Sequence, residues 1–246
     1  GILGISLNIT KQKQEDEHRI QIKIEQERIK LLSEFMTQVS HEFRTPLTII
    51  ETSTYLISKM DHPEKLSKHL DKISEQTNNI ETLIQNMMTL SAIDSNRLLP
   101  SERVDLNHLL RDKQSELQNR DVDCQLELSD NRLMVIGNSS YFDQAIDHIL
   151  NNAIQHTAHE DTIIIRSSEV DNVAIIDIID SGKGIDDKDL PHIFDRFYRA
   201  DKTGSMRGFG LGLPLARAII ERYGGRVDIQ STSEAGSHFR ISLPII

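Results

Sequence analysis

The sequence predicts two domains, an all-α antiparallel helical hairpin that forms a dimeric four-helix bundle, followed by an α/β sandwich. No glycine occurs between Gly4 and Gly137, and the apolar residues before Pro100 recur at helical spacing. After Pro100 the chain has short β-rich runs, further helical stretches and most of the glycines. We therefore place the domain boundary at residues 97–104.

Composition excludes several classes of function. The 246 residues carry a net charge of −10, which disfavours nonspecific binding to nucleic acid or to anionic membranes. Aromatic residues make up only 4% and tryptophan is absent, so a base-stacking surface is not expected. The single cysteine, Cys124, indicates a reducing compartment and a cytoplasmic location. No apolar run approaches the roughly 20 residues of a membrane span, so no membrane contact is expected in this fragment.

The first 37 residues predict two connecting segments. Residues 1–9 alternate in polarity like a strand, and "GILGISLNITKQKQ" resembles the last strand of a PAS sensor domain and its exit into a helix. Residues 1–10 are therefore expected to be the remnant of an upstream PAS-like domain. Residues 11–37 are charged with an apolar stripe, which predicts a coiled-coil signalling linker or, alternatively, one solvated helix. The stripe consists of Ile20, Ile24, Leu31 and Phe35.

Residues 38–96 predict the helical hairpin. The first helix continues to about Met60, "MDHPEK" is a turn with Pro63 at the first helical position, and the second helix covers about 64–95. Two antiparallel helices cannot bury both apolar stripes against each other, whereas the hairpins of two chains can form a four-helix bundle. The stripe of the second helix contains Leu66, Leu70, Ile73, Ile80, Ile84 and Met87.

The stretch "SHEFRTPLTII", residues 40–50, is unusual within its helix. Val39, Phe43 and Leu47 share one face, which places His41 on the opposite, solvated side. Pro46 lies one turn further on, where a proline inside a helix costs roughly 3 kcal/mol.

Residues 105–246 predict one mixed sheet covered by helices. A turn at 171–172 separates two of the strands, and Ser139 or Ser140 is expected to cap the helix that follows. The expected helices are 107–117, 139–157 and 211–223, and the expected strands are 122–128, 132–137, 161–169, 172–180, 226–232 and 237–245.

Several polar and glycine-rich strings in this second domain indicate a nucleotide-binding site. Asp180 ends a strand, where its carboxylate can accept from an exocyclic amine. Gly182 and Gly184 would let a flat ring approach the backbone, and "GFGLGL" at 208–213 opens a helix whose N-terminus suits phosphate. Asn152 offers an oxygen ligand of the kind that Mg²⁺ uses together with phosphates and water. Each piece alone also fits a turn, a cap or a surface amide.

Taken together, the strings resemble the transmitter core of a sensor histidine kinase. "SHEFRTPLT" resembles the phosphoacceptor box of that family, "NNAIQHT" its N box and "DSGKGI" its first glycine box. "IFDRFYRAD" resembles its F box, "GFGLGL" its second glycine box and "EAGSHFRISLP" its closing strand. The resemblance covers about residues 30–246 and implies a HisKA-type dimerisation and phosphotransfer domain at 38–96. It also implies an ATP-binding α/β sandwich of the Bergerat (GHKL) type at 105–246.

The resemblance implies roles for three residues of the first domain. His41 would receive the phosphoryl group of ATP, and Glu42 would act as the general base at its ring. Thr45, one turn from His41, would help position water when the partner response regulator is dephosphorylated. Pro46 has no N–H to donate to the carbonyl of Glu42, so the helix is expected to bend there.

In the second domain the resemblance implies ATP and Mg²⁺ as ligands. Asp180 would bind the adenine amino group, and Asn152 would bind Mg²⁺. Residues 185–207 would form a mobile lid, with Phe194 and Phe197 packed at its base. The remaining nucleotide-contacting residues implied by the family are Gly182, Gly184, Gly208, Gly210, Leu211 and Gly212. The candidate phosphate contacts are Arg199, Lys202 and Arg207. Each of these three can equally be a solvated charge of a surface loop.

Two positions depart from the family pattern. One turn before Asn152 the family usually has asparagine, and here it has His148; three residues after Asn152 it often has lysine, and here it has Gln155. A neutral imidazole can replace an amide, but a protonated one cannot accept a hydrogen bond. We therefore expect MgATP affinity to weaken as the pH falls toward about 5.5, near the range where a histidine ordinarily protonates.

The resemblance implies a homodimeric protein-histidine kinase that passes the phosphoryl group to an aspartate of a response regulator receiver domain. Two alternatives stay open, an ATP-driven clamp with the same nucleotide fold and a degenerate transmitter that serves as a dimeric scaffold. The "SHEFRTPL" string argues against the first, and the intact Asp180, Asn152 and glycines argue against the second. The hairpin turn does not reveal whether phosphorylation occurs within one chain or across the dimer.

Overall fold

The computed structural model describes residues 2–59, 63–95, 100–119, 123–157, 162–200, 208–231 and 236–246. The chain separates into two compact units, Gly1–Glu81 and Thr82–Ile246. The second unit therefore contains the last turns of the second helix in addition to the whole sheet domain. None of the helices in the described ranges is both long and apolar enough to cross a membrane.

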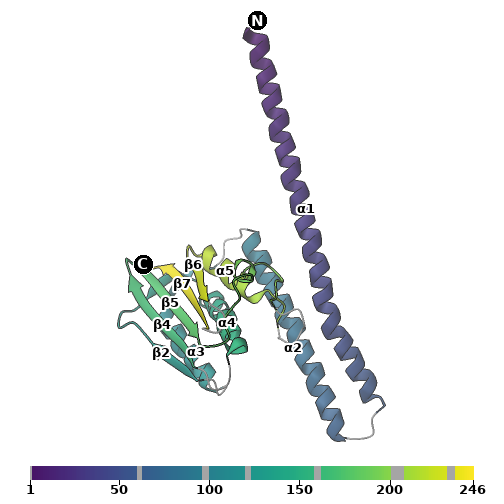
Figure 1. Cartoon of the computed structure of the whole chain (residues 1–246), viewed down its shortest axis with the longest axis vertical. Coiled ribbons are helices and arrows are strands. Elements are labelled where there is room, and N and C mark those ends of the chain that lie inside the picture. The colour runs from purple at the N-terminus through teal and green to yellow at the C-terminus, as the bar shows by residue number, and fades with distance from the viewer. Residues whose placement is uncertain are drawn as a thin grey trace. The chain divides into compact units, whose positions relative to one another are not determined.

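Two long helices dominate the first part of the chain (Figure 1). Helix α1 covers Ile2–Ile57 and continues through Pro46, and helix α2 covers Pro63–Asp94 with its proline at the first position, as predicted. The strand predicted for residues 1–9 is wrong, because residues 2–9 belong to α1. Alternating β-branched residues indicate a strand only weakly, and continuity with the helix that follows overrides that preference here.

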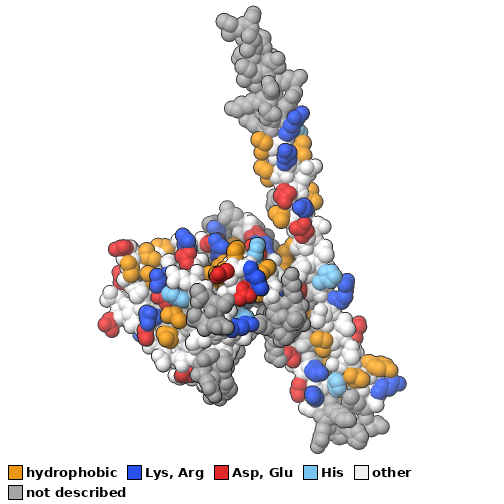
Figure 2. All heavy atoms as spheres, in the orientation of Figure 1, with side chains coloured by type: hydrophobic (Ala, Val, Ile, Leu, Met, Phe, Trp, Pro, Cys, Tyr) orange, Lys and Arg blue, Asp and Glu red, His pale blue; other side chains and the backbone are white. Residues whose placement is uncertain are grey.

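The described part of α1 has many apolar side chains at its surface (Figure 2). They include Ile20, Ile24 and Leu31, which are 58%, 56% and 58% exposed in the single chain, together with Leu47 and Tyr55. Isolated exposed apolar residues are common, but a sustained stripe on a helix indicates a surface that another helix covers.

The second unit contains a five-stranded sheet with the strand order β2-β4-β5-β7-β6 (Figure 1). Strands β2 and β4 are parallel and the other pairs are antiparallel, so the sheet is mixed, as predicted. Helices α3 and α4 come before β4, and α5 lies between β5 and β6. The bounds are β1 Glu102–Asp105, α3 Leu106–Asn119, β2 Cys124–Glu127, β3 Met134–Gly137, α4 Ser139–His156, β4 Ile163–Val170, β5 Val173–Asp180, α5 Gly212–Arg222, β6 Arg226–Ser231 and β7 Ser237–Pro244.

Strand β1 and the cap of α4 differ from the prediction. The segment assigned to a linker at 97–104 contains the start of β1, which pairs antiparallel with β3 in a separate two-stranded sheet. Helix α4 is capped by Asn138, whose side-chain oxygen accepts from the backbone N–H of Tyr141, rather than by Ser139 or Ser140. Asp171 and Asn172 have positive φ, as a tight β4–β5 turn requires, which confirms that turn.

Helices α3 and α4 are joined by a buried ammonium group. The side chain of Lys113 on α3 is 2% exposed, and its Nζ lies 3.1 Å from Glu116, 2.7 Å from Asp143 and 2.8 Å from Asp147. Burial alone would lower the pKa of Lys113, but the hydrogen bonds to Asp143 and Asp147 outweigh it and raise the pKa. The ammonium therefore stays charged and holds the two helices together.

One row of residues across the five strands alternates in charge. The strand register places Glu127, Arg166, Asp177, Arg240 and Asp228 side by side, one from each strand. The Nε atom of Arg166 lies 2.7 Å from Glu127, and that of Arg240 lies 2.7 Å from Asp177. Burial acts to raise the pKa of Asp177, but hydrogen bonds from Arg240 and His238 prevail and lower it. We call this row the charge ladder.

Candidate functional site

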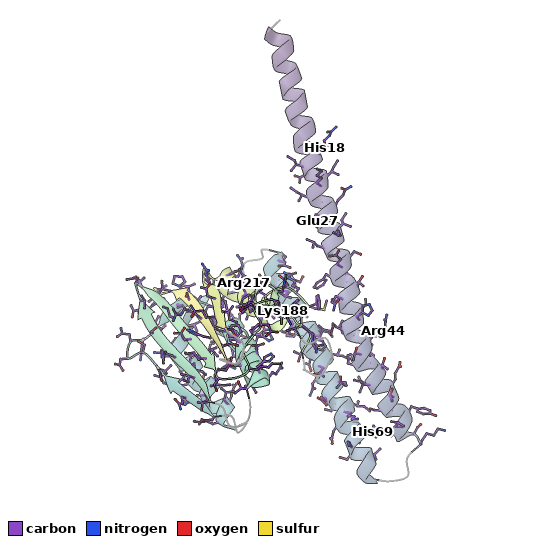
Figure 3. All side chains as sticks on the ribbon, viewed as in Figure 1. His18, Glu27, Arg44, His69, Lys188 and Arg217 are labelled. Atoms are coloured by element: carbon purple, nitrogen blue, oxygen red, sulfur yellow. The ribbon has the colours of Figure 1, made fainter. Side chains whose placement is uncertain are left out.

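The phosphoacceptor string lies on the exposed side of α1. His41 and Thr45 are exposed, Glu42 is half-buried and Pro46 is buried. The exposed position of His41 is the one that helical spacing predicted. The Oε1 atom of Glu42 accepts a long hydrogen bond of 3.4 Å from the side chain of Gln38, one turn earlier. The neighbouring Arg44 is also exposed on α1 (Figure 3), and the roles assigned to these residues stay predictions.

Asp180 is buried at the end of β5 with its carboxylate fixed by backbone groups. Its Oδ1 atom accepts from the N–H of Gly182 at 3.0 Å and from the N–H of Ser237 at 3.1 Å. Its side chain is held by donors on two different strand ends, so its orientation is set by the sheet itself. A carboxylate fixed in this way can present its remaining acceptor capacity to one planar ligand.

The turn after Asp180 packs directly against the end of α4. A Cβ atom at Gly182 would clash with the carbonyl oxygen of His156, so only glycine fits at this close approach. The same carbonyl accepts from the N–H of Lys183 at 3.3 Å. The structure thus brings the predicted first glycine box and the predicted N box together.

Three side chains lie one turn apart along one face of α4. His148, Asn152 and His156 are at i, i+4 and i+8, and each has a buried nitrogen with no hydrogen-bond partner among the described residues. Their orphaned atoms are Nε2 of His148, Nδ2 of Asn152 and Nδ1 of His156. Buried polar atoms normally have partners, so this row fits a site that a polar ligand completes.

The second glycine box leads into α5 and contacts the described part of the segment that was predicted as the lid. Gly210 has φ of 65°, and its carbonyl accepts from the N–H of Phe197 at 2.8 Å. A Cβ at Gly210 would lie 2.6 Å from the carbonyl carbon of Phe197. Leu211 is the buried N-cap residue of α5, and Gly212 begins that helix. The backbone of Phe197 thus packs against the glycine loop, and the ring of Phe194 lies 5.1 Å from the guanidinium of Arg217.

The remaining predicted site residues lie partly within the described ranges. Lys202 and Arg207 lie outside the described residues, as does most of the second half of the lid predicted at 185–207. Arg199 is half-buried at the end of the described segment, and its phosphate role stays a prediction. Gly184 and Gly208 both have positive φ, at 69° and 134°. Gln155 is exposed on α4.

The sequence prediction overlooked His156. It follows Asn152 by four residues, so helical spacing alone could have placed both side chains on the same face. Burial is the largest effect on its ring, and with the nearby charge of Lys183 it lowers the pKa of His156.

His148 is close to the start of α5. Its Nδ1 atom lies 3.1 Å from the position that a Cβ of Gly212 would occupy, so the imidazole packs against the first residue of that helix. Burial lowers the pKa of His148 from 6.5 to about 4. The ring is therefore still neutral at pH 5.5, so the loss of nucleotide affinity expected near that pH cannot come from protonation of His148.

The low pKa of His148 predicts a pH-dependent stability. As the pH falls below 6.5, the unfolded chain binds a proton at His148 that the folded chain does not bind. Acidification therefore lowers the free energy of unfolding, by about 2 kcal/mol at pH 5 relative to neutral pH. His148→Asn should remove this part of the loss, while His156 remains in both proteins. Thermal unfolding at pH 7 and pH 5 measures it, and an equal decrease in both proteins would contradict the prediction.

Two family descriptions match the chain in the order that the sequence predicted. Residues 31–96 match the His Kinase A (phospho-acceptor) domain. Residues 137–246 match the histidine kinase-, DNA gyrase B- and HSP90-like ATPase domain, which includes α4, the Asp180 turn and the glycine loop.

Curated relatives agree with these matches. The chain is 32% identical over 220 residues to the signal transduction histidine-protein kinase ArlS of Staphylococcus epidermidis, an alignment that covers 87% of this chain and 48% of ArlS. It is 28% identical over 219 residues to the sensor protein SrrB of Staphylococcus aureus, covering 86% of this chain and 38% of SrrB. The chain thus spans about half the length of these relatives or less.

Solved structures share the fold. The histidine kinase ThkA, crystallised in complex with the response regulator protein TrrA, is similar with a TM-score of 0.71 and 26% identity, over 90% of this chain and 64% of that one. The Acinetobacter baumannii histidine kinase AdeS shows the same fold with a TM-score of 0.65 and 23% identity, over 83% of this chain and 98% of that one. From these matches and the site geometry, the chain belongs to the sensor histidine kinases, of which it carries the transmitter core.

Proposed function

We propose that the chain is an ATP-dependent protein-histidine kinase that phosphorylates itself on His41. The observation that carries the proposal is that one chain combines an exposed histidine in a phosphoacceptor string with a buried carboxylate, Asp180, fixed beside a glycine-lined site. An exposed acceptor is needed because a separate nucleotide-binding unit has to reach it. The proposal extends to transfer of the phosphoryl group to an aspartate of a response regulator.

In the phosphorylation step, a ring nitrogen of His41 attacks the γ-phosphorus of ATP. A nitrogen–phosphorus bond forms, the bond to the β,γ-bridging oxygen breaks, and ADP leaves with the electron pair. Glu42 accepts the proton of the imidazole, which keeps the attacking nitrogen nucleophilic. Phosphoryl transfer depends mainly on alignment and on charge stabilisation, so the exposed position of His41 matters more than a special environment.

The residues of the second unit suit ATP with a bound magnesium ion. Asp180 would accept from the adenine amino group, and Asn152, on the face of α4 that carries the unpartnered nitrogens, would offer its side-chain oxygen to the metal. Bound Mg²⁺ would neutralise charge on the phosphates. The N-terminus of α5, opened by Gly212, would provide backbone N–H groups to the phosphates.

Thr45 is proposed to support removal of the phosphoryl group from the regulator rather than its transfer to His41. It lies one turn from His41, on the same exposed side of α1, and its hydroxyl can orient water. Thr45→Ala should therefore keep autophosphorylation and lose most of the phosphatase activity toward a phosphorylated regulator. Both rates can be measured on one preparation, with Thr48→Ala on the same helix as the control. An unchanged dephosphorylation rate would exclude the role of Thr45.

The hairpin is proposed to form a homodimer through the apolar side chains that are exposed in the single chain. Light scattering on the intact protein should give twice the chain mass of 28.0 kDa. Leu70, which is 52% exposed on α2, should be buried in the dimer, so Leu70→Asp should shift the mass toward the monomer. Ile136→Asp in the sheet domain, where the side chain is 44% exposed, is the matched control and should leave the dimer intact. A monomeric intact chain would refute the proposal.

Incubation with γ-labelled ATP and magnesium tests the kinase proposal against its two alternatives. A phosphoprotein whose label is stable in alkali and lost in acid supports the kinase. Released phosphate without labelled protein would indicate an ATP-driven clamp. The absence of both products would indicate a scaffold that has lost its activity.

A cytoplasmic location for this portion is part of the proposal, because ATP is its substrate and Cys124 is a free thiol.

A further inference from the structure

One ring nitrogen of His148 is buried and unpaired within the described part of the chain. This atom, Nε2, is shielded from solvent and has no hydrogen-bond partner among the described residues. The other ring nitrogen, Nδ1, lies against Gly212, the first residue of α5. A buried polar atom that stays unpaired destabilises the folded chain, so a ligand that bonds to Nε2 would remove this penalty.

The imidazole of His148 keeps a lone pair that can bind a cation. Burial lowers the pKa of His148 to about 4, so the ring is neutral at physiological pH. A neutral imidazole has one N–H group and one nitrogen with a free electron pair. When Nδ1 carries the proton, the free pair is on the buried Nε2, and a neutral ring nitrogen is a common ligand of metal ions.

His148 and Asn152 have the spacing of two metal ligands on one helix. They lie one turn apart on the same face of α4, and residues at i and i+4 of a helix can bind one ion together. Asn152 is the residue proposed above to bind the cation. The described residues contain no group of three or more His, Cys, Asp and Glu side chains that could hold a metal ion. Phosphate and water oxygens therefore have to supply the remaining ligands, so the cation enters with the nucleotide.

The place of His148 in the fold matches the phosphates of the nucleotide rather than its adenine. His148 lies beside the N-terminus of α5, which is proposed above to bind the phosphates. His156, at the other end of the row on α4, has its carbonyl against Gly182 in the Asp180 turn, where adenine is proposed to bind. A cation that accompanies the phosphates is therefore matched by His148 and not by His156.

We propose that His148 is a nitrogen ligand of the nucleotide-bound cation and makes the site prefer a first-row transition ion such as Mn²⁺ to Mg²⁺. This role rests on the proposed kinase function. Mg²⁺ binds oxygen ligands and gives up its water reluctantly, so an imidazole adds little to its binding. Transition ions accept imidazole nitrogen more readily, and Mn²⁺ is the weakest binder of their series, which makes it a stringent probe. Asparagine at position 148 would offer oxygen instead and would favour Mg²⁺.

Pulsed electron paramagnetic resonance of Mn²⁺ measures the ligation directly, without kinase activity. The probe is Mn²⁺ with a methylene-bridged ATP analogue, which has no nitrogen in its phosphate chain. The unmodified chain should show coupling of Mn²⁺ to a bound imidazole nitrogen, and labelling all histidines with ¹⁵N should change that coupling. His148→Asn should lose it, whereas His108→Asn, at an exposed position on α3, should keep it. Coupling that is absent, insensitive to the label, kept in His148→Asn or lost in His156→Asn alone would overturn the assignment.

Equilibrium titration with the same analogue supplies a second readout. The ratio of the Kd with Mg²⁺ to the Kd with Mn²⁺ should fall about tenfold in His148→Asn, the lower end of the change that even an indirect partner of a metal causes. The ratio should stay the same in His108→Asn. If the unmodified chain binds the analogue with neither ion, the kinase proposal fails and the role of His148 fails with it. Binding with a ratio that His148→Asn leaves unchanged would overturn the role of His148 and leave the kinase proposal standing.

Discussion

The His41→Gln protein is expected to bind ATP and to carry no phosphoryl group. Glutamine keeps the length and polarity of the side chain, but its amide nitrogen is not a nucleophile, so the transfer has no acceptor. ATP binding should persist, because the nucleotide residues lie in the second compact unit and do not include position 41. The incorporation of phosphate should fall below the detection limit, which makes this the largest effect on activity that the structure predicts.

The measurement is incorporation of γ-labelled phosphate, paired with a binding titration using ATP. His18→Gln is the matched control, since His18 is an exposed histidine on the same helix (Figure 3). The control should take up label as the unmodified chain does. Label remaining on the His41→Gln protein would show that another residue is the acceptor.

Lys113→Met should cause the largest loss of stability. Methionine fills much of the space of the lysine stem, so the packing between α3 and α4 is largely kept. The side chains of Glu116, Asp143 and Asp147 would then lose their shared cation and repel one another. Removing one partner of a buried ion pair costs about 3–5 kcal/mol, and partial hydration of these half-exposed carboxylates reduces the expected loss to about 2–3 kcal/mol.

Thermal unfolding at neutral pH measures the loss. Lys188→Met is the control, because Lys188 pairs with Asp186 at the surface, where its side chain is 76% exposed (Figure 3). The control should unfold like the unmodified protein. The difference between Lys113→Met and the unmodified chain should shrink in acid as the carboxylates protonate. An equal effect of the two substitutions would show that the ion cluster does not stabilise the domain.

Local periodicity was sufficient to predict most of the secondary structure. Helix α2, helix α4 and the β4–β5 hairpin all carry strong repeats; α2 begins at a proline, α4 begins after a capping residue, and a tight turn joins the two strands. Strand β1 was missed because its four residues contain a single buried apolar residue, Val104, which pairs with Val135, 31 residues further along the chain. A strand that is stabilised mainly by a partner distant in the sequence shows no repeat in its own residues.

The same limit applies within the candidate site. Asp180 and Asn152 were found because their strings are distinctive, and the structure adds that the Asp180 turn packs on the end of α4. The burial that lowers the pKa of His148 depends on the position of α5, more than 60 residues further along the chain. Gln144 contacts Thr89 and Asn86, which lie 55 and 58 residues away in the sequence, so no local pattern could reveal these contacts.

The charge ladder gives the sheet a safeguard against mispairing that its apolar pattern does not provide. A strand that slips by two residues keeps every apolar side chain on the inner face, so hydrophobic burial barely distinguishes the correct alignment from that error. In the ladder the same slip between β4 and β5 would set Arg166 opposite Ile175 or Ile179 and leave Asp177 without its cross-strand neighbour. Because every strand contributes one charge, a slip at any of the four seams would break opposite-charge neighbours. The charge ladder thus favours the correct strand register each time the sheet assembles.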